Sequence, residues 1–581
     1  MANLRVWAPQ VEQVELLVGE QRETMISRGD GVFELDSPAL VDGARYALSL
    51  DGGPPLPDAR SSHQPDGVHA RSAWVDHSLF QWKHAEFRAL PLAAAVIYEL
   101  HIGSFSAEGT FDGAQQHLEH LVDLGVTHVE VMPVAAFPGR AGWGYDGVNP
   151  FAPLAAYGGP DGFKRFVDAC HGRGLAVILD VVYNHLGPSG NYLGQYGPYF
   201  TSRYQTPWGQ AVNFDDAGSD EVRRYFLENL TCWYRDYQVD GLRLDAVHAI
   251  FDSSATHILE ALAVRKSELE REMGKPLILV AESDLNDPRL VRAREVGGYG
   301  LDAAWCDDLH HALHTVVTGE KRGYYSDFGT LAQLARVLRR GYVFDGSYST
   351  FRQRSHGRSA ADLPGERFVA CLQNHDQIGN RALGERITHV FDGEGAQRLE
   401  QVKVAITLLL TSPFVPLLFQ GEEWASSSPF PYFTDFDDAE LAEAVRRGRR
   451  SEFSGFGWSP EEIPDPQAPS TFESARLDWS ERGSSHHAGM LEHYRSLIRL
   501  RRTQPELRGG PLDRVEVSYD ESARWLIVRR DGIEVIANFG DSTLRLPCPA
   551  SRRILLRSRP GCKHEEETLC VPGPGAVIVG D

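Results

Sequence analysis

The 581-residue sequence has few cysteines and little positive charge, and both absences exclude classes of protein. Its seven cysteines are scattered and form no CxxC pair that could bind zinc or carry out redox chemistry. They are typical of reduced thiols in a cytoplasm. Lysine and arginine total 58 against 80 aspartates and glutamates, which gives a formal charge of −22. This balance disfavours nucleic acid and anionic membranes as partners, whereas a neutral substrate would not be repelled.

Signals for export and membrane insertion are also lacking. The N-terminal segment MANLRVWAPQVEQVEL has no basic region followed by an apolar stretch, so we expect no signal peptide. The longest apolar run, Ile406–Phe419, is too short to span a bilayer and contains two prolines. We therefore expect a cytoplasmic protein that does not enter a membrane.

The apolar pattern divides this long chain into three predicted domains. From Leu4 to about Asp76, short alternating segments such as VEQVELLV and GVFELD are separated by turns, which predicts an N-terminal β-sandwich within residues 1–88. After a predicted helix at 487–503, alternation returns in ARWLIVRR and IEVIANFG. This pattern predicts a C-terminal all-β domain at 506–581.

Between these domains, in residues 89–505, eight short apolar segments alternate with helical ones. Continuous apolar strands alternating with helices are typical of a parallel sheet, and eight such units favour a (β/α)₈ barrel. No GxGxxG follows the first strand, which disfavours a dinucleotide-binding sheet. The strands are predicted at 96–101, 126–133, 175–185, 239–248, 277–283, 301–307, 368–375 and 414–422. Helices are predicted at 115–124, 162–171, 221–237, 254–273 and 330–340.

Two insertions are predicted near the mouth of this barrel. Residues 186–218 carry seven aromatics and six glycines, which indicates a long loop at the C-terminal end of the third strand, where barrel enzymes build their sites. Aromatic faces suit sugar rings, although the same rings could simply pack the loop onto the barrel. A second irregular span, 430–478, follows the eighth strand and is expected to wall the same pocket.

Four predicted strands end in acidic residues or an Asn-His pair: ILDVVYNH, LRLDAVH, LVAES and CLQNHDQIGN. A pair such as Arg243 and Asp245 could by itself be a structural ion pair, because a buried charge needs a partner. Four such endings in one barrel favour a site, since the carboxyl ends of barrel strands converge on one mouth. We expect the following side chains to meet there: Asp180, His185, Arg243, Asp245, His248, Glu282, Asn374, His375 and Asp376.

Two chemistries fit a mouth rich in carboxylates. The first is a divalent metal that activates water, and the second is a retaining glycosidase with a nucleophile and an acid/base about 5 Å apart. Arg243 favours the second, because its charge would repel a metal but would keep Asp245 ionised as a nucleophile. Glu282 follows the apolar run LILVA, where partial burial would raise its pKa, as a proton donor needs. The expected site thus contains no metal and no cofactor.

The four stretches DVVYNH, GLRLDAVH, AES and NHDQIG resemble the four conserved regions of the α-amylase superfamily of retaining α-glucan enzymes. The leading VWAP segment is similar to the N-terminal β-sandwich of its branching and debranching members. This resemblance implies that Asp245 is the nucleophile, Glu282 the acid/base and Asp376 the transition-state stabiliser. It also implies that further residues bind sugar: Tyr145, His185, Arg243, His248, Asn374, His375, Gln377 and Asn380.

Other segments, among them YELHIGSFSAEGTFDGA and AESDLNDPR, resemble the superfamily members that release trehalose from the end of maltooligosyltrehalose. The resemblance implies a neutral oligosaccharide substrate and a pathway shared with a maltooligosyltrehalose synthase, without a stable complex. Branching and isoamylase-type debranching activities remain alternatives. We would expect something closer to EDVS after the general acid of the former, and Phe in place of Leu242 and Leu244 in the latter. A glucan-binding protein without activity would not need all three acids.

The segment 305–314, WCDDLHHALH, is predicted to end the sixth strand and resembles the stretch beside the family's leaving-group subsites. The resemblance implies that Asp307, Asp308 and His310 bond to trehalose hydroxyls. Polar residues at a strand end can also cap the next helix, so a purely structural role stays open.

Overall fold

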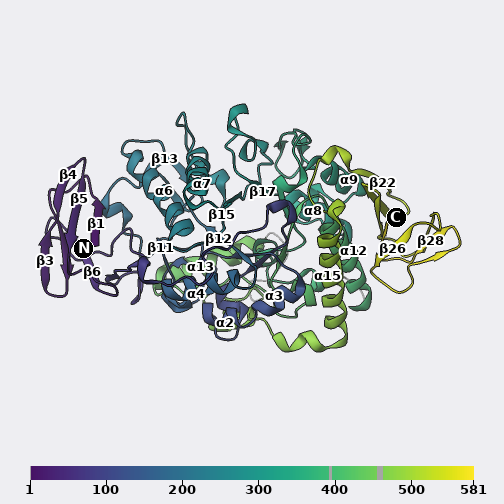
Figure 1. Cartoon of the computed structure of the whole chain (residues 1–581), viewed down its shortest axis with the longest axis horizontal. Coiled ribbons are helices and arrows are strands. Elements are labelled where there is room, and N and C mark those ends of the chain that lie inside the picture. Colours follow the sequence, from purple (N-terminus) through teal and green to yellow (C-terminus); the bar gives the residue numbers. More distant parts are fainter. Residues whose placement is uncertain (1, 391–394, 455–461, 581) are drawn as a thin grey trace.

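The computed structural model describes residues 2–390, 395–454 and 462–580. A closed barrel of eight parallel strands lies between an N-terminal β domain and a C-terminal β domain, which occupy opposite ends of the molecule (Figure 1). The predicted fold class is therefore confirmed. The domain boundaries at 88/89 and 505/506 stay predictions. Among the described residues, no helix is long and apolar enough to cross a membrane.

The N-terminal domain consists of two antiparallel sheets, ordered β1-β5-β4 and β3-β2-β6-β7. Leu4 and Val6 of one sheet and Val14 and Leu16 of the other are buried in the same apolar cluster, as the alternating pattern predicts. The strands are β1 (Ala2–Trp7), β2 (Val14–Val18), β3 (Gln21–Thr24), β4 (Ile26–Gly29), β5 (Val32–Ser37), β6 (Arg45–Leu50) and β7 (Ser72–Ala73).

All eight predicted barrel strands are present, each somewhat shorter than the apolar run that predicts it. They follow one another around the barrel in chain order, and the last pairs with the first to close it. The strands are β8 (Ile97–Leu100), β9 (His128–Val131), β12 (Ala176–Val181), β15 (Gly241–Leu244), β16 (Ile278–Ala281), β17 (Ala303–Trp305), β20 (Phe368–Cys371) and β21 (Val415–Phe419).

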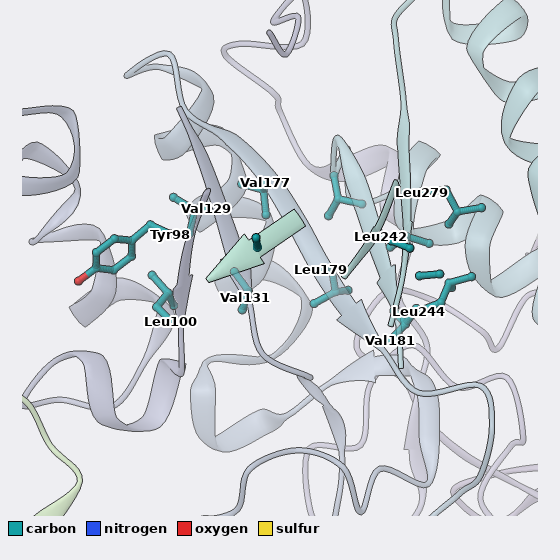
Figure 2. Close-up of a cluster of buried hydrophobic side chains, with 14 of the residues drawn as sticks. Tyr98, Leu100, Val129, Val131, Val177, Leu179, Val181, Leu242, Leu244 and Leu279 are labelled. Atoms are coloured by element: carbon teal, nitrogen blue, oxygen red, sulfur yellow. The ribbon is translucent and has the colours of Figure 1, made fainter. Parts of the chain in front are cut away.

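Alternate side chains of these strands point to opposite faces of the sheet. One set, labelled in Figure 2 and including Val177 and Leu179 of β12, belongs to the large core cluster that also contains residues of the surrounding helices. The other set points into the barrel, where Ile97, Ile178 and Ile278 form part of a separate apolar cluster. Polar residues take over this inward-facing set toward the C-terminal ends of the strands, where the predicted mouth lies.

All six predicted helices are confirmed, namely α3 (Leu118–Leu124), α4 (Gly159–His171), α6 (Ser219–Arg235), α7 (Ile258–Met273), α9 (Leu331–Arg340) and α15 (Ser485–Thr503). Besides α13 (Ala439–Ser454), described below, two long helices escaped prediction, α8 (Asp307–Thr318) and α12 (Gly395–Thr411). α8 has a clear helical spacing of apolar residues at 309, 312, 313, 316 and 317, but its first residues are predicted as the end of the sixth strand. The second half of α12 is part of the apolar run 406–419, which shows no clear amphipathic period.

The structure corrects three predictions about connecting segments. Residues 186–218 are not a plain loop, because they contain α5 (Leu193–Tyr196) and a hairpin of β13 (Phe200–Thr206) and β14 (Gly209–Val212). The span 430–478 contains α13 (Ala439–Ser454) and α14 (Pro469–Ser474), although residues 455–461 lie outside the described part. The sixth strand ends at Trp305, and Asp307 begins α8 instead of ending that strand.

The C-terminal domain also has two sheets, ordered β22-β23-β24-β29-β26 and β25-β28-β27, and it packs on α12 and α15. Its strands are β22 (Glu516–Asp520), β23 (Trp525–Arg530), β24 (Ile533–Asn538), β25 (Leu544–Pro547), β26 (Arg553–Arg557), β27 (Lys563–Glu565), β28 (Thr568–Val571) and β29 (Gly575–Gly580). The remaining short elements are α1 (Ile102–Phe105), α2 (Phe111–Gln115), β10 (Ala135–Ala136), β11 (Asn149–Pro153), β18 (Tyr348–Ser349), β19 (Arg354–Ser355), α10 (His375–Gly379) and α11 (Ile387–Val390).

Candidate active site

Arg243, fully buried near the end of β15, holds three carboxylates that come from three strands. Its Nη1 donates to both carboxylate oxygens of Asp180, at 2.9 and 2.8 Å, and to Oδ1 of Asp245 at 2.7 Å. Its Nη2 lies 3.2 Å from Oε2 of Glu282. The guanidinium carbon also lies 4.3 Å from the ring centre of Trp305. This buried cation is therefore compensated by its neighbours, as burial of a charge requires.

Asp245, the residue after β15, is held at both carboxylate oxygens. Besides the bond from Arg243 to Oδ1, the side-chain amide of Asn184 donates to Oδ2 at 2.7 Å and to the Asp245 carbonyl oxygen at 2.8 Å. Only 10% of the Asp245 side chain is exposed. These contacts fix the carboxylate in one orientation at the C-terminal end of the strand.

Glu282 follows β16 and lies beside Asp245. The backbone N–H of Ala246 donates to its Oε2 at 2.5 Å, and Ala246 adopts a left-handed conformation with φ of 39°. Strained backbone of this kind clusters at functional sites, and here it presents an N–H to the carboxyl group. Burial raises the pKa of Glu282 well above its usual range, although the charge of Arg243 opposes the rise. A carboxyl group in this setting can carry a proton near neutral pH.

A buried chain of hydrogen bonds joins His375 to the Arg243 cluster. Nδ1 of His375 lies 2.5 Å from Oε1 of Glu99, and its Nε2 lies 2.7 Å from the hydroxyl of Tyr145. That hydroxyl donates to Oδ2 of Asp180 at 2.7 Å. Burial alone would lower the pKa of His375, but Glu99 and Asp376 raise it to about 9. The ring is therefore charged at neutral pH, with an N–H for Glu99 and another for Tyr145.

Asp376 is the most exposed of the three predicted catalytic acids. Its side chain is 35% exposed, its Oδ1 lies 3.5 Å from Nε2 of His375, and the Asn380 side chain donates to the same oxygen at 3.4 Å. The charge of Asp376 also contributes to the raised pKa of Glu282. The structure thus brings the three acids together around two cations, Arg243 and His375.

The hairpin formed by β13 and β14 reaches this cluster. Trp208, in the turn between the two strands, stacks on the ring of His185 with centroids 4.3 Å apart and planes 5° apart. Nε2 of His185 lies 3.0 Å from the carbonyl oxygen of Tyr145, which fixes the ring beside the network. Trp208 is 50% exposed and so offers one aromatic face to solvent. Tyr145 itself is half-buried, with its ring stacked on His375.

The remaining predicted sugar-binding residues differ in their position. Asn374 is buried and caps α10, because its side chain accepts a bond from the N–H of Gln377 at 2.8 Å. Gln377 is half-buried and accepts a bond from Tyr324, whereas Asn380 is exposed. His248 is exposed in the turn that follows Asp245.

Two of the three residues predicted from segment 305–314 are buried and bonded within the protein. Asp308 is 5% exposed, and its Oδ2 accepts bonds from the Asn286 side chain and from the N–H groups of Val343 and Phe344. His310 is 2% exposed, with both ring nitrogens occupied by the Leu372 carbonyl and the Tyr325 hydroxyl. The hydrogen-bonding groups of both residues are thus occupied within the protein, and their contacts with trehalose stay a prediction.

Asp307, the first residue of α8, is the exception in that segment. It is partly exposed, and burial together with the nearby charges of Asp376 and Asp284 raises its pKa to about 7. Asp307 therefore lies close to the acid cluster, and its carboxyl group is accessible to a sugar hydroxyl.

Three residues of the network escaped the sequence analysis. Glu99 and Asn184 hold His375 and Asp245, and Glu130 stands in register with Glu99 on the neighbouring strand. Both side-chain oxygens of Glu130 are buried without a hydrogen-bond partner among the described residues. One sequence signal could have found both glutamates, because each is an acidic residue within an apolar strand. Glu99 lies in IYEL and Glu130 in HVEV.

Comparisons with known proteins decide the family. Residues 64–205 match the family described as alpha amylase, catalytic domain, and residues 512–579 match a domain of unknown function. The chain is 48% identical to the malto-oligosyltrehalose trehalohydrolase of Rhizobium sp. (strain M-11), over 99% of this chain and 97% of that protein. The chain belongs to the malto-oligosyltrehalose trehalohydrolase family. The enzyme of that name from Arthrobacter ramosus is 51% identical, over 86% of this chain and 87% of its own.

A solved structure agrees with membership of this family at the level of the whole fold. The structure titled putative alpha amylase from Salmonella typhimurium superposes with a TM-score of 0.90 at 37% identity, covering all of this chain and 97% of its own. A 1,4-alpha-glucan branching enzyme from Xanthomonas campestris is only 28% identical, over 76% of this chain and 63% of that enzyme. The trehalohydrolase family is therefore favoured over the branching alternative.

Proposed function

We propose that this protein hydrolyses the α-1,4-glucosidic bond next to the terminal trehalose unit of maltooligosyltrehalose, releasing trehalose and a maltooligosaccharide. The observation that carries the chemistry is the arrangement of two carboxyl groups, Asp245 and Glu282, on the two Nη atoms of one guanidinium. Such neighbours suit the separation of about 5 Å that retaining glycosidases use. The relatives named for this activity match nearly the whole chain, which supports the choice of substrate.

The proposed reaction proceeds in two displacements. Asp245 attacks the anomeric carbon while Glu282 gives its proton to the departing glycosidic oxygen of trehalose. Glu282 then takes a proton from water, and that water breaks the bond between Asp245 and the sugar, so the α-configuration is retained. Asp376 stabilises the transition state by holding sugar hydroxyls while the ring distorts.

The environment of each acid suits its proposed role. Arg243 and Asn184 hold both oxygens of Asp245, so the nucleophile is oriented before substrate arrives. The raised pKa of Glu282 favours the protonated form that a general acid needs. Tyr145, His185, Trp208 and Asp307 border the same cluster from different segments of the chain and are proposed to contact the sugars.

Chromatography of the products tests the proposal directly. Purified protein incubated with maltooligosyltrehalose should yield free trehalose and a maltooligosaccharide that is one trehalose unit shorter than the substrate. Incubation with amylopectin is the control, because branching would change the branch pattern and debranching would release linear chains. Absence of trehalose from the first substrate, together with changes in the second, would overturn the assignment.

We further propose that the protein acts in the cytoplasm, after a maltooligosyltrehalose synthase that supplies its substrate and without a stable complex between the two. All seven cysteines are free thiols in the structure, as a reducing compartment favours. We also keep the proposed division into an N-terminal sandwich at 1–88, a barrel domain at 89–505 and a C-terminal β domain at 506–581.

A further inference from the structure

A second cluster of reactive side chains lies away from the barrel mouth. Donor atoms of His77, Cys232 and Asp236 all lie within 4.8 Å of one another. Cys232 lies in the last turn of α6, and Asp236 follows the helix directly with helical backbone angles, so these two residues, four apart, lie on the same side. Because β15 begins shortly after Asp236, the cluster is at the N-terminal end of the barrel strands, opposite the acids that are proposed to react.

His77 comes from a different part of the chain, the segment that leads from the N-terminal sheets toward the barrel. It begins the short 3-10 helix His77–Leu79, soon after β7. Its Nε2 lies 3.2 Å from the hydroxyl of Ser62, whereas its Nδ1 is buried without a hydrogen-bond partner among the described residues. This is the arrangement of a metal-binding histidine, in which one ring nitrogen is oriented by a hydrogen bond and the other is free to bind the ion.

We propose that His77, Cys232 and Asp236 bind a Zn²⁺ ion that fastens the N-terminal domain to helix α6. A thiolate, an imidazole and a carboxylate are the ligand types that zinc takes, and three protein ligands leave a fourth tetrahedral position for water. All three residues line a cavity of about 560 Å³ between the N-terminal domain and α6, which gives the ion a path from solvent.

The proton balance of this binding follows from the state of the thiol. Burial and the neighbouring Asp236 raise the pKa of Cys232 well above its usual range, so the free site carries a protonated thiol. Burial and the charge of Lys164 lower the pKa of His77 to about 4, so its ring is neutral. Binding of Zn²⁺ therefore forms the bond to sulfur and releases the thiol proton to water, while the imidazole loses none.

The positive charge of Lys164, on α4, disfavours a cation bound at this cluster. Lys164 is 1% exposed, its ammonium lies 5.7 Å from the ring centre of Tyr237, and its charge acts on both His77 and Asp236. Arg235 also donates to Oδ1 of Asp236, which leaves Oδ2 for an ion. Loss of the Lys164 charge should therefore strengthen zinc binding, which makes this residue a probe of the site.

The test uses the full chain without a histidine tag, stripped with chelator and dialysed against micromolar zinc. We expect one zinc per chain by elemental analysis, a thiolate-to-cobalt absorption band with Co²⁺ in its place, and a higher melting temperature with zinc. Cys232→Ser and His77→Gln should lose the band and weaken zinc binding at least about tenfold. Asp236 is partly exposed, so Asp236→Asn removes a ligand with less disturbance of folding. It should also weaken zinc binding, and it replaces Cys232→Ser and His77→Gln if those variants fail to fold.

Cys570→Ser is the matched control, because it makes the same chemical change at a buried cysteine in the C-terminal domain and should keep the zinc. Lys164→Met should bind zinc more tightly than the unchanged chain. Removal of zinc should lower the melting temperature while turnover at low temperature stays unchanged, since the ion takes no part in the reaction. The proposal is overturned if the stripped protein takes up no zinc, if Cys232→Ser keeps its full content, or if Lys164→Met binds no more tightly.

Discussion

The inside of the barrel has two layers that differ in chemistry. The lower layer consists of aliphatic side chains such as Ile97, Ile178 and Ile278, which need only to fill space. Two residues further along their strands, Ile97 and Ile178 are followed by Glu99 and Asp180, and Arg243 stands in register with Asp180 on the neighbouring strand. The same backbone therefore carries a layer whose members act independently and a layer whose members need one another.

This difference shows why the upper layer is present at all. Ion pairs in a protein interior contribute little net stability, because removing charges from water offsets their mutual attraction. Well-packed aliphatic residues would hold the barrel at least as well. The polar layer is therefore best explained by chemistry, and variants of the two layers should separate effects on turnover from effects on stability.

The largest effect is expected from the reacting acids at the top of the polar layer. Asp245→Asn or Glu282→Gln should lower kcat for trehalose release by about 10⁴-fold or more, since each removes a group that makes or breaks a bond. Both changes keep the shape of the side chain, so circular dichroism and the melting temperature should stay near those of the unchanged protein. Normal turnover in either variant contradicts the assigned role.

Removal of the shared cation is expected to have the largest effect on folding. Arg243→Met fills similar space but leaves Asp180 and Asp245 buried without their partner, which should cost about 3–5 kcal/mol of unfolding free energy. Urea denaturation measures the loss. Arg243→Lys is the matched control, because it keeps the charge and loses the planar fork, so it should recover part of the stability and little of the turnover. Equal stability of all three proteins would contradict a shared role for the guanidinium.

The two layers were not equally predictable from the sequence. Apolar runs gave all eight strands, and an Arg two residues before an Asp marked the mouth, because both signals are local. The partner of His375 was not predictable: Glu99 precedes it by 276 residues, and only barrel closure brings the two together. The internal bonds of Asp308 and His310 were not predictable for the converse reason, since a polar residue near a strand end looks the same whether it faces the mouth or caps a buried segment.

The third prediction concerns the buried pair of His375 and Glu99. The pKa of His375 is raised from its ordinary 6.5 to about 9 in the folded protein, so its charged form stabilises the fold. That contribution, up to about 3 kcal/mol, should be fully present below pH 6.5 and lost as pH rises through 9. Chemical denaturation at several pH values measures it. Glu99→Gln should remove most of this dependence, and a variant that keeps the full alkaline loss would show that another group causes it.

The smallest effect is expected in the aliphatic layer. Ile178→Val removes one methylene from a fully buried side chain, which should cost about 0.5–1.5 kcal/mol of unfolding free energy and leave kcat unchanged at temperatures where the protein is folded. Ile178 is adjacent in the chain to Leu179, whose side chain faces the helices, so Leu179→Ile is a control of equal volume on the other face of the same strand. A fall in kcat beyond about tenfold for Ile178→Val, with stability nearly kept, would mean that the lower layer positions the acids above it and that the two layers are one functional unit.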